Sequence, residues 1–222
     1  MTAKLPHWVE VGAFILALVA GFVNAVGLLS FEHQSVSHLS GTATLLGTSV
    51  LNSSFQHVLH LSGILLSFLF GAIIAGFLLH GSTLKLGRHY DTALYLESAL
   101  LLITLGLLAM GSFYGHFFAS AACGLQNSLA TRYSGAIIRT THVTGIFTDL
   151  GIMCGEFLRG EALDKRKAKL FIIIIIGFIF GGTVGALLYT QYQFMSLLLP
   201  AGICLLLAII YRFYCQNQAI EN

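Results

Sequence analysis

The sequence predicts an all-α integral membrane protein, built as an inverted internal repeat, with about six transmembrane helices plus two short re-entrant or broken helices. Three observations lead to this class: a composition too apolar for a water-exposed surface, a signature that occurs twice, and basic residues that fall on one side of a six-span arrangement. The chain has 222 residues, of which 56% are hydrophobic and 9% are charged. Soluble domains carry about 25% charged residues, so the composition places this chain in a bilayer.

The repeated signature is a polar motif inside strongly apolar sequence. Residues 37–47 read SHLSGTATLLG and residues 141–151 read THVTGIFTDLG, and a Gly-x-x-Asn motif precedes each copy, ending at Asn24 and at Asn127. The copies are separated by about half of the chain, which indicates a duplication. We therefore expect a single membrane domain over residues 1–222, with repeat 1 at about 8–112 and repeat 2 at about 113–214.

Six stretches are apolar and approach the roughly 20 residues that a helix needs to cross a bilayer. They are residues 8–30, 58–79, 93–112, 113–132, 170–191 and 194–212. Four of them carry small residues at every fourth position, a spacing that lets helix backbones approach closely in lipid. These stripes are Ala13, Ala17, Gly21 and Ala25; Gly63, Ser67, Gly71 and Ala75; Ser120, Gly124 and Ser128; and Gly177, Gly181 and Gly185. The stripes predict a compact helix bundle and by themselves say nothing about a substrate.

The two signature segments, at residues 40–52 and 144–157, are also apolar but shorter than a span. More polar residues precede each of them, at 31–36 and 134–140, and Ser40 and Thr144 stand where N-caps are expected. We interpret each copy as an extended entry followed by a short helix. Such non-helical backbone is tolerated at membrane depth only where protein buries it or where it lines a wet cavity.

The basic residues discriminate between two topologies. If both short segments cross the membrane, giving eight spans, Lys85, Arg88, Arg132 and Arg139 face one side and the other seven basic residues face the opposite side. If both are re-entrant, giving six spans, all 11 basic residues fall on one side. The positive-inside rule favours six spans, with the N- and C-termini and the loops at 81–92 and 159–169 in the cytoplasm, and His33 and Gln56 outside. The eight-span alternative stays open at this point.

Two short helices that enter from opposite faces would bring their N-terminal tips together near mid-membrane. Polar groups at that depth are costly and usually functional. The candidate substrate-binding or pore residues are Asn24, His38, Ser40, Thr42, Asn127, Arg139, His142, Thr144, Thr148 and Asp149. The alternative is that the histidines and asparagines only lock neighbouring helices together. Asp149 breaks the symmetry of the repeat, so it could instead carry a proton or a cation, or pair with Arg139.

The same motifs resemble those of the YoaK-like family of uncharacterised bacterial inner-membrane proteins. The resemblance rests on residues 21–25 (GFVNA), Ser40-Gly41, residues 124–127 (GLQN) and residues 140–145 (TTHVTG), and it covers nearly the whole chain. It implies a multi-pass protein of about six spans in the bacterial inner (cytoplasmic) membrane. It supplies no substrate, activity or catalytic residue.

The architecture favours a small-solute channel or secondary transporter. A structural or regulatory membrane subunit is the alternative, and a membrane-embedded enzyme using His38, His142 and Asp149 comes third. The sequence has no dense metal motif, nucleophile motif or nucleotide-binding motif, so we expect no enzyme activity, catalytic residue, cofactor, metal or nucleic-acid partner. Two converging helix N-termini create a positive potential, which favours a small neutral or anionic polar solute. The lipid bilayer is the other partner, and a homo-oligomer is compatible with the sequence.

Overall fold

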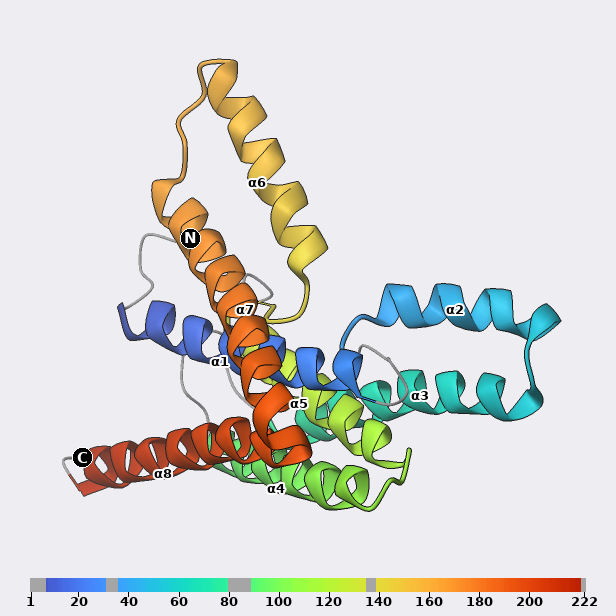
Figure 1. Ribbon diagram of the computed structural model, residues 1–222. Helices are drawn as coiled ribbons and strands as arrows, with labels where there is room; N and C mark the ends of the chain where they lie inside the picture. Colours follow the sequence, from blue (N-terminus) through green and yellow to red (C-terminus); the bar gives the residue numbers. More distant parts are fainter. Residues whose placement is uncertain (1–6, 31–35, 80–88, 135–138, 221–222) are drawn as a thin grey trace.

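A computed structural model describes residues 7–30, 36–79, 89–134 and 139–220, and every regular element within these residues is a helix (Figure 1). The elements are α1 (His7–Leu29), α2 (Leu39–Asn52), α3 (Phe55–Leu78), α4 (Tyr90–Ala109), α5 (Gly115–Ser134), α6 (Val143–Leu158), α7 (Lys165–Tyr192), the 3-10 helix η2 (Gln193–Leu197) and α8 (Leu198–Ile220). The all-helical prediction is confirmed. Residues 81–88 of the predicted loop at 81–92, and His33, lie outside the described residues.

Four stretches of the described residues are long and apolar enough to cross a membrane. They are Trp8–Leu29, Phe55–Leu78, Tyr90–Ala109 and the 52-residue stretch Lys165–Gln216, which contains α7, η2 and the apolar part of α8. The chain is therefore an all-helical membrane protein. The predicted span at 113–132 corresponds to α5 (Gly115–Ser134), which is not among the four because its sequence is more polar. The count of six spans stays a prediction.

Helices α1 and α7 cross with their backbones in contact. A Cβ atom at Gly21 would overlap the carbonyl oxygen of Phe178, and one at Gly181 would overlap the carbonyl oxygen of Leu18. Because the hydrophobic effect cannot drive helix association in lipid, helices associate through van der Waals packing, and such close contacts increase it. Along α7, Gly177, Gly181 and Gly185 lie in turn against Phe14, Leu18 and Phe22 of α1, so the two helices are parallel.

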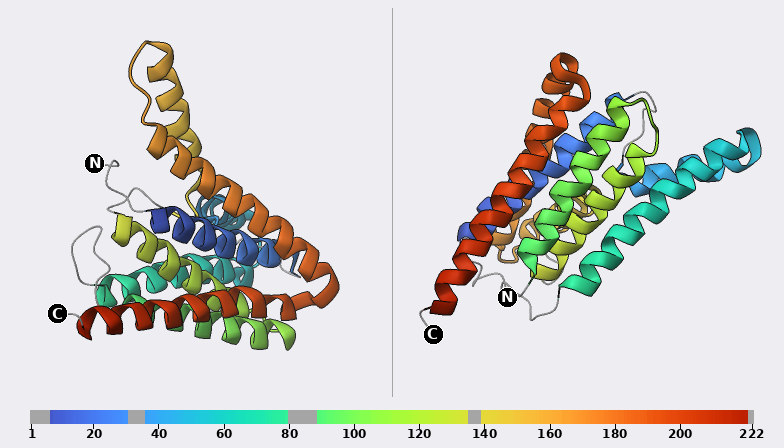
Figure 2. Two further views of the ribbon diagram at one scale, coloured as in Figure 1. Left: turned by 90° about the vertical axis from the view of Figure 1, so that its left-hand side faces the viewer. Right: turned by 90° about the horizontal axis from the view of Figure 1, so that it is seen from below.

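Helices α3 and α5 cross in the same way. A Cβ atom at Gly124 would overlap the carbonyl oxygen of Phe68, and one at Gly71 would overlap the carbonyl oxygen of Ala121. Ser120 strengthens the contact because its hydroxyl group donates to the carbonyl oxygen of Ile64 at 2.9 Å. This pair runs opposite to the first one, as the directions of α1 and α5 show in Figures 1 and 2. Helix α4 packs against both α5 and α8 and completes the bundle.

The two short helices project away from the bundle (Figure 1). Helix α2 packs along α3, and α6 packs along α7. The prediction that Ser40 and Thr144 are N-caps is wrong. The helices begin one residue before them, at Leu39 and Val143, and the N-cap positions hold His38 and His142. Most of the predicted extended entries lie outside the described residues.

The four cysteines are free thiols. Cys123 and Cys204 are buried in the bundle, as expected for thiols in apolar helices. Cys154 also lies in an apolar helix, but it is exposed because only one side of α6 is covered. Cys215, near the end of α8, is exposed as well.

Candidate solute-binding cavity

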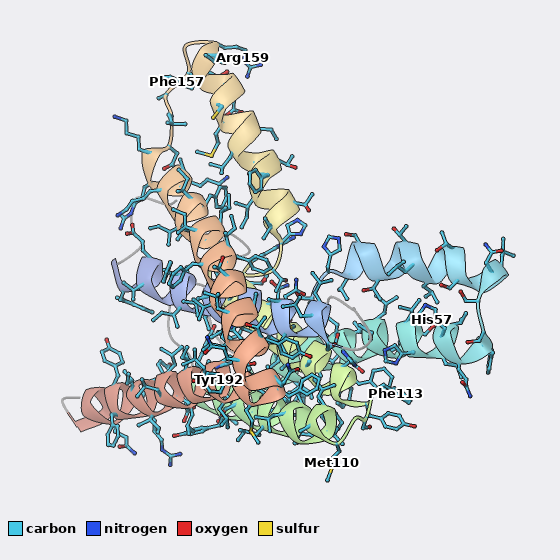
Figure 3. The ribbon with its side chains drawn as sticks, viewed as in Figure 1. His57, Met110, Phe113, Phe157, Arg159 and Tyr192 are labelled. Carbon is cyan, nitrogen blue, oxygen red and sulfur yellow. The ribbon has the colours of Figure 1, made fainter. Side chains whose placement is uncertain are left out.

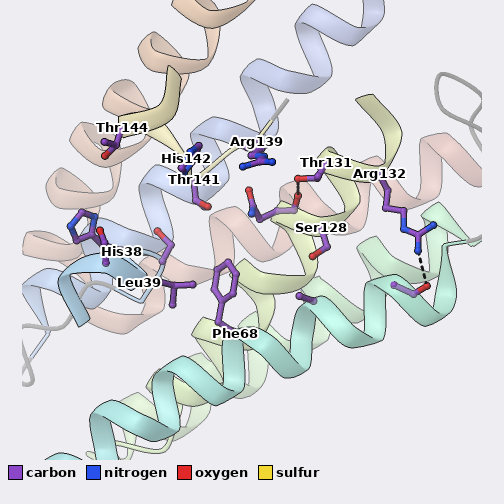
Figure 4. Close-up of a pocket in the computed structure, with 15 residues that line it drawn as sticks. His38, Leu39, Phe68, Ser128, Thr131, Arg132, Arg139, Thr141, His142 and Thr144 are labelled. Atoms are coloured by element: carbon purple, nitrogen blue, oxygen red, sulfur yellow. Dashed lines mark hydrogen bonds between the residues drawn. The ribbon is translucent and has the colours of Figure 1, made fainter. Parts of the chain in front are cut away.

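A cavity of about 580 Å³ lies where the N-terminal ends of α2 and α6 approach the C-terminal halves of α3 and α5. Its lining residues are Ser37, His38, Leu39, Ser40, Phe68, Ala72, Gly76, Asn127, Ser128, Thr131, Arg132, Arg139, Thr141, His142 and Thr144. Figure 4 shows His38 and His142 at one end of the cavity and Arg132 at the other. Both copies of the signature therefore contribute to one cavity.

The histidine and glycine of each signature form a unit. A Cβ atom at Gly41 would overlap the imidazole ring of His38, and a Cβ atom at Gly145 would overlap that of His142. Each ring thus lies over the first turn of its own helix, and the spacing His-x-x-Gly is explained by this contact. Neither His38 nor His142, the two N-cap residues, accepts a hydrogen bond from its helix through its side chain. The N-cap side chains therefore leave the first-turn N–H groups without a capping acceptor.

The wall opposite the signature comes from α3 and α5. Phe68, Ala72 and Gly76 recur every fourth residue and form one face of α3. They are apolar, while α5 contributes Asn127, Ser128, Thr131 and Arg132, all polar. The wall therefore begins at the close helix crossing near Phe68 and extends to the last turn of α5.

The two asparagines that precede the signatures differ in their contacts. Asn24 Oδ1 accepts hydrogen bonds from the backbone N–H of Ser37 at 3.2 Å and from its hydroxyl group at 3.0 Å. Asn127 Oδ1 is buried and has no hydrogen-bond partner among the described residues. Thr141, which occupies the place of Ser37 in the second copy, lines the cavity instead. Among the described residues, the equivalent pair is therefore hydrogen-bonded in the first copy, whereas the Asn127 oxygen accepts no such bond from Thr141 in the second.

The charged side chains among the described residues of the cavity wall are all basic. Arg132 and Arg139 line it together with the two histidines, whereas no Asp or Glu is found among the described residues of its wall. The Arg132 guanidinium reaches across to α3, where it donates to the carbonyl oxygen of Gly76 at 3.5 Å. Arg139 is exposed and lies near Thr141 and His142 in Figure 4.

Six of the ten predicted site residues line this cavity: His38, Ser40, Asn127, Arg139, His142 and Thr144. The other four do not. Asn24 binds Ser37, and Thr42 is buried with its hydroxyl group donating to the carbonyl oxygen of His38 at 3.3 Å. Thr148 donates to the carbonyl oxygen of Thr144 at 3.0 Å on the exposed part of α6. Asp149 is exposed on the same helix and forms no ion pair with Arg139.

Five polar residues of the wall were missed by the sequence argument. Ser37 and Thr141 are the first residues of the two signatures and could have been included on that ground. Ser128, Thr131 and Arg132 follow Asn127 by one, four and five residues, so helical periodicity places them on the same face of α5. The signal was present, but we treated Ser128 as a packing residue and Arg132 only as a topology marker.

Within the described residues, no group of three or more His, Cys, Asp or Glu side chains is arranged to hold a metal ion. In Figure 3, Phe157 on α6 and Met110 in the turn after α4 lie at the outside of the molecule, and both are exposed.

Comparison with known proteins agrees with this membrane architecture. The family described as Protein of unknown function (DUF1275) matches residues 12–210. In Bacillus subtilis (strain 168), the UPF0700 transmembrane protein YoaK is 29% identical over 174 residues, which represent 71% of each chain. No solved structure matches the chain. The resemblance expected from the signatures is confirmed: the chain belongs to the DUF1275 family.

Proposed function

We propose that this protein is a secondary transporter that binds a small polar solute, neutral or anionic, in the cavity between the tips of α2 and α6. The observation that carries the proposal is the cavity itself, because both signatures and the polar face of α5 converge on it. Polar walls are expensive inside a membrane protein unless they serve a solute or its water. Helix ends at membrane depth are likewise tolerated where they line a wet cavity.

The proposal includes six spans and an inverted repeat. Support comes from the close crossings, because the contact of Gly21 with Phe178 has a counterpart in the contact of Gly124 with Phe68. In each case a helix from one half of the chain packs on a helix from the other half, and the two pairs run in opposite directions. Transporters with this plan bind their solutes where broken helices meet between the repeats.

The proposed cellular location is the bacterial inner membrane, with both termini in the cytoplasm. The segregation of Lys and Arg supports this orientation. Trp8, Tyr90, Tyr211 and Tyr214 gather around one groove at the N-terminal ends of α1 and α4 and the C-terminal part of α8. Aromatic residues of this kind are enriched where helices leave the hydrocarbon core, so they support a membrane interface at this end. Arg132 lies at the C-terminal end of α5, and the cavity then opens toward the cytoplasm.

The unequal asparagines favour a transporter over a channel. A channel needs a path open at both ends, whereas a transporter closes one end while the other is open. Asn24 is bonded to Ser37, while Asn127 and Thr141 face an open cavity. We therefore assign the first pair to the closed side and the second pair to the open side.

Uptake into proteoliposomes tests the proposal. The full-length protein is reconstituted and exposed to labelled neutral, anionic and cationic solutes, with unlabelled solute inside the vesicles to detect counterflow. We expect counterflow of one class, and its loss in His38→Ala and His142→Ala, while His57→Ala retains it because His57 lies outside the cavity wall. If no class of solute enters the vesicles, or if both cavity variants fail to fold, the result supports the alternative of a structural membrane subunit.

A further inference from the structure

We infer that the solute is an anion that also carries an O–H group, such as a hydrogen phosphate or a small hydroxycarboxylate, and that Arg132 and Arg139 bind its charged oxygens. This inference rests on the proposed function, because it names the solute class of the same cavity. It goes further by favouring anionic over neutral solutes and by assigning specificity to two arginines.

The charge of the wall excludes cations and disfavours neutral solutes. Arg132 and Arg139 both line the cavity, and its described lining residues include no carboxylate that could neutralise them. Asp149, the acidic residue of the second signature, is exposed on α6 and is absent from the wall. The planar guanidinium group presents donors in a fork that matches the two oxygens of a carboxylate or a phosphate.

The helix ends add to this field. Helices α2 and α6 both begin at the cavity, and neither has a side-chain cap. Their first-turn N–H groups and the positive ends of their dipoles therefore point toward the same space. These helix ends supplement the two arginines, which provide full charges.

Asn127 explains the requirement for an O–H group. Its Oδ1 atom is buried and has no hydrogen-bond partner among the described residues, and the residue itself lines the cavity. A buried acceptor left without a donor is costly, and a carboxylate or phosphate oxygen without a proton cannot supply one. A solute that presents both an anionic group and a hydroxyl group satisfies the arginines and this oxygen together.

The size of the cavity fits such a solute. Its volume of about 580 Å³ lies in the range of about 300–1,000 Å³ that is usual for small-molecule sites. A three-carbon acid occupies only part of this volume, and bridging water molecules fill the remainder.

Thermal unfolding of the purified full-length protein in detergent tests binding without requiring transport. The probes are inorganic phosphate, lactate, propionate and 1,2-propanediol at equal ionic strength; propionate lacks the hydroxyl group of lactate, and propanediol lacks its charge. We expect phosphate or lactate to raise the melting temperature, propionate to bind at least about tenfold more weakly than lactate, and propanediol to give no shift.

The variants are Arg132→Gln, Arg139→Gln and, as a matched loss of charge outside the cavity, Arg159→Gln. Each cavity variant should weaken binding of the stabilising anion by about 10- to 100-fold, with Arg159→Gln unchanged. Arg132→Lys, which keeps the charge but loses the fork, should fall between Arg132→Gln and wild type and also controls for folding. Equal shifts with propanediol and lactate, or arginine variants that fold and bind as wild type does, would overturn the inference.

The two proposals fail separately. Arginine-dependent binding of an anion without flux of any probe would refute transport and retain the anion site. Flux of a neutral solute that does not change in Arg132→Gln and Arg139→Gln would refute the anion site and retain transport.

Discussion

At the scale of single residues, the two asparagines show how one motif serves two roles. Asn24 Oδ1 accepts two hydrogen bonds from Ser37, so it holds the entry to α2 against α1. Asn127 Oδ1 makes no such bond and belongs to the wall of the cavity. Equivalent positions of the two repeats therefore have different roles: Asn24 fixes the entry to α2, and Asn127 lines the cavity.

This difference predicts that the same substitution affects folding stability at Asn24 and solute uptake at Asn127. Asn24→Ala should lower the free energy of unfolding by about 1 kcal/mol, because two hydrogen bonds are lost. Asn127→Ala should leave that free energy nearly unchanged and should reduce solute uptake. Denaturation of both variants in detergent, paired with the uptake assay, measures the two effects. Similar destabilisation of both proteins would show that the two asparagines are equivalent structural locks.

At the scale of helices, backbone contact at glycine holds the bundle together. The α1–α7 and α3–α5 crossings each place two glycines against a carbonyl oxygen of the partner helix. None of these four oxygens can move aside, because each one belongs to a helix backbone. The ion pair between Lys169 Nζ and Glu10 Oε2, at 2.7 Å, adds a second contact between α7 and α1.

Two glycines of α1 give a matched test of these crossings. Gly21→Ala places a methyl group on the Phe178 carbonyl oxygen and should lower the free energy of unfolding by about 1–3 kcal/mol. Gly12→Ala adds the same group in the same helix, where nothing lies within 4 Å, and should be neutral or slightly stabilising. Unfolding of both variants in the same detergent provides the comparison. An unchanged Gly21→Ala protein would mean that α1 and α7 are not in backbone contact.

At the scale of the whole molecule, the topology decides whether α2 and α6 can meet from opposite faces. In the six-span arrangement, Gln56 lies outside and Glu161 lies in the cytoplasm. In the eight-span arrangement, both lie in the cytoplasm. Only the first arrangement gives the two halves of the chain opposite orientations about the cavity.

Cysteine labelling from outside the cell distinguishes the arrangements. The exposed Cys154 and Cys215 are replaced by Ser, and the buried Cys123 and Cys204 are kept because they fill the bundle. An impermeant maleimide should label Gln56→Cys in intact cells and Glu161→Cys only after permeabilisation. Absence of Gln56→Cys labelling until the cells are opened would support eight spans.

Much of this molecule could be predicted because periodicity and apolar length determine where membrane helices form. The duplication led us to expect His38 and His142 in one place, and both line the cavity. The N-caps could not be predicted, because the packing of each His ring over a Gly is a three-dimensional contact that no local cap preference encodes. Arg132 was missed although helical periodicity places it on the face of α5 that carries Asn127, because we used its charge only to orient the chain in the membrane.

The central claim is that solute passes through the cavity at the tips of α2 and α6, and a pair of adjacent substitutions tests it most directly. Ala72 lines the cavity, while its neighbour Ile73 is exposed on the outer face of α3. Ala72→Trp should fill the cavity and abolish uptake into proteoliposomes, whereas Ile73→Trp should leave uptake at the wild-type rate, with both proteins folded by thermal unfolding. Equal uptake by the two variants would contradict the account.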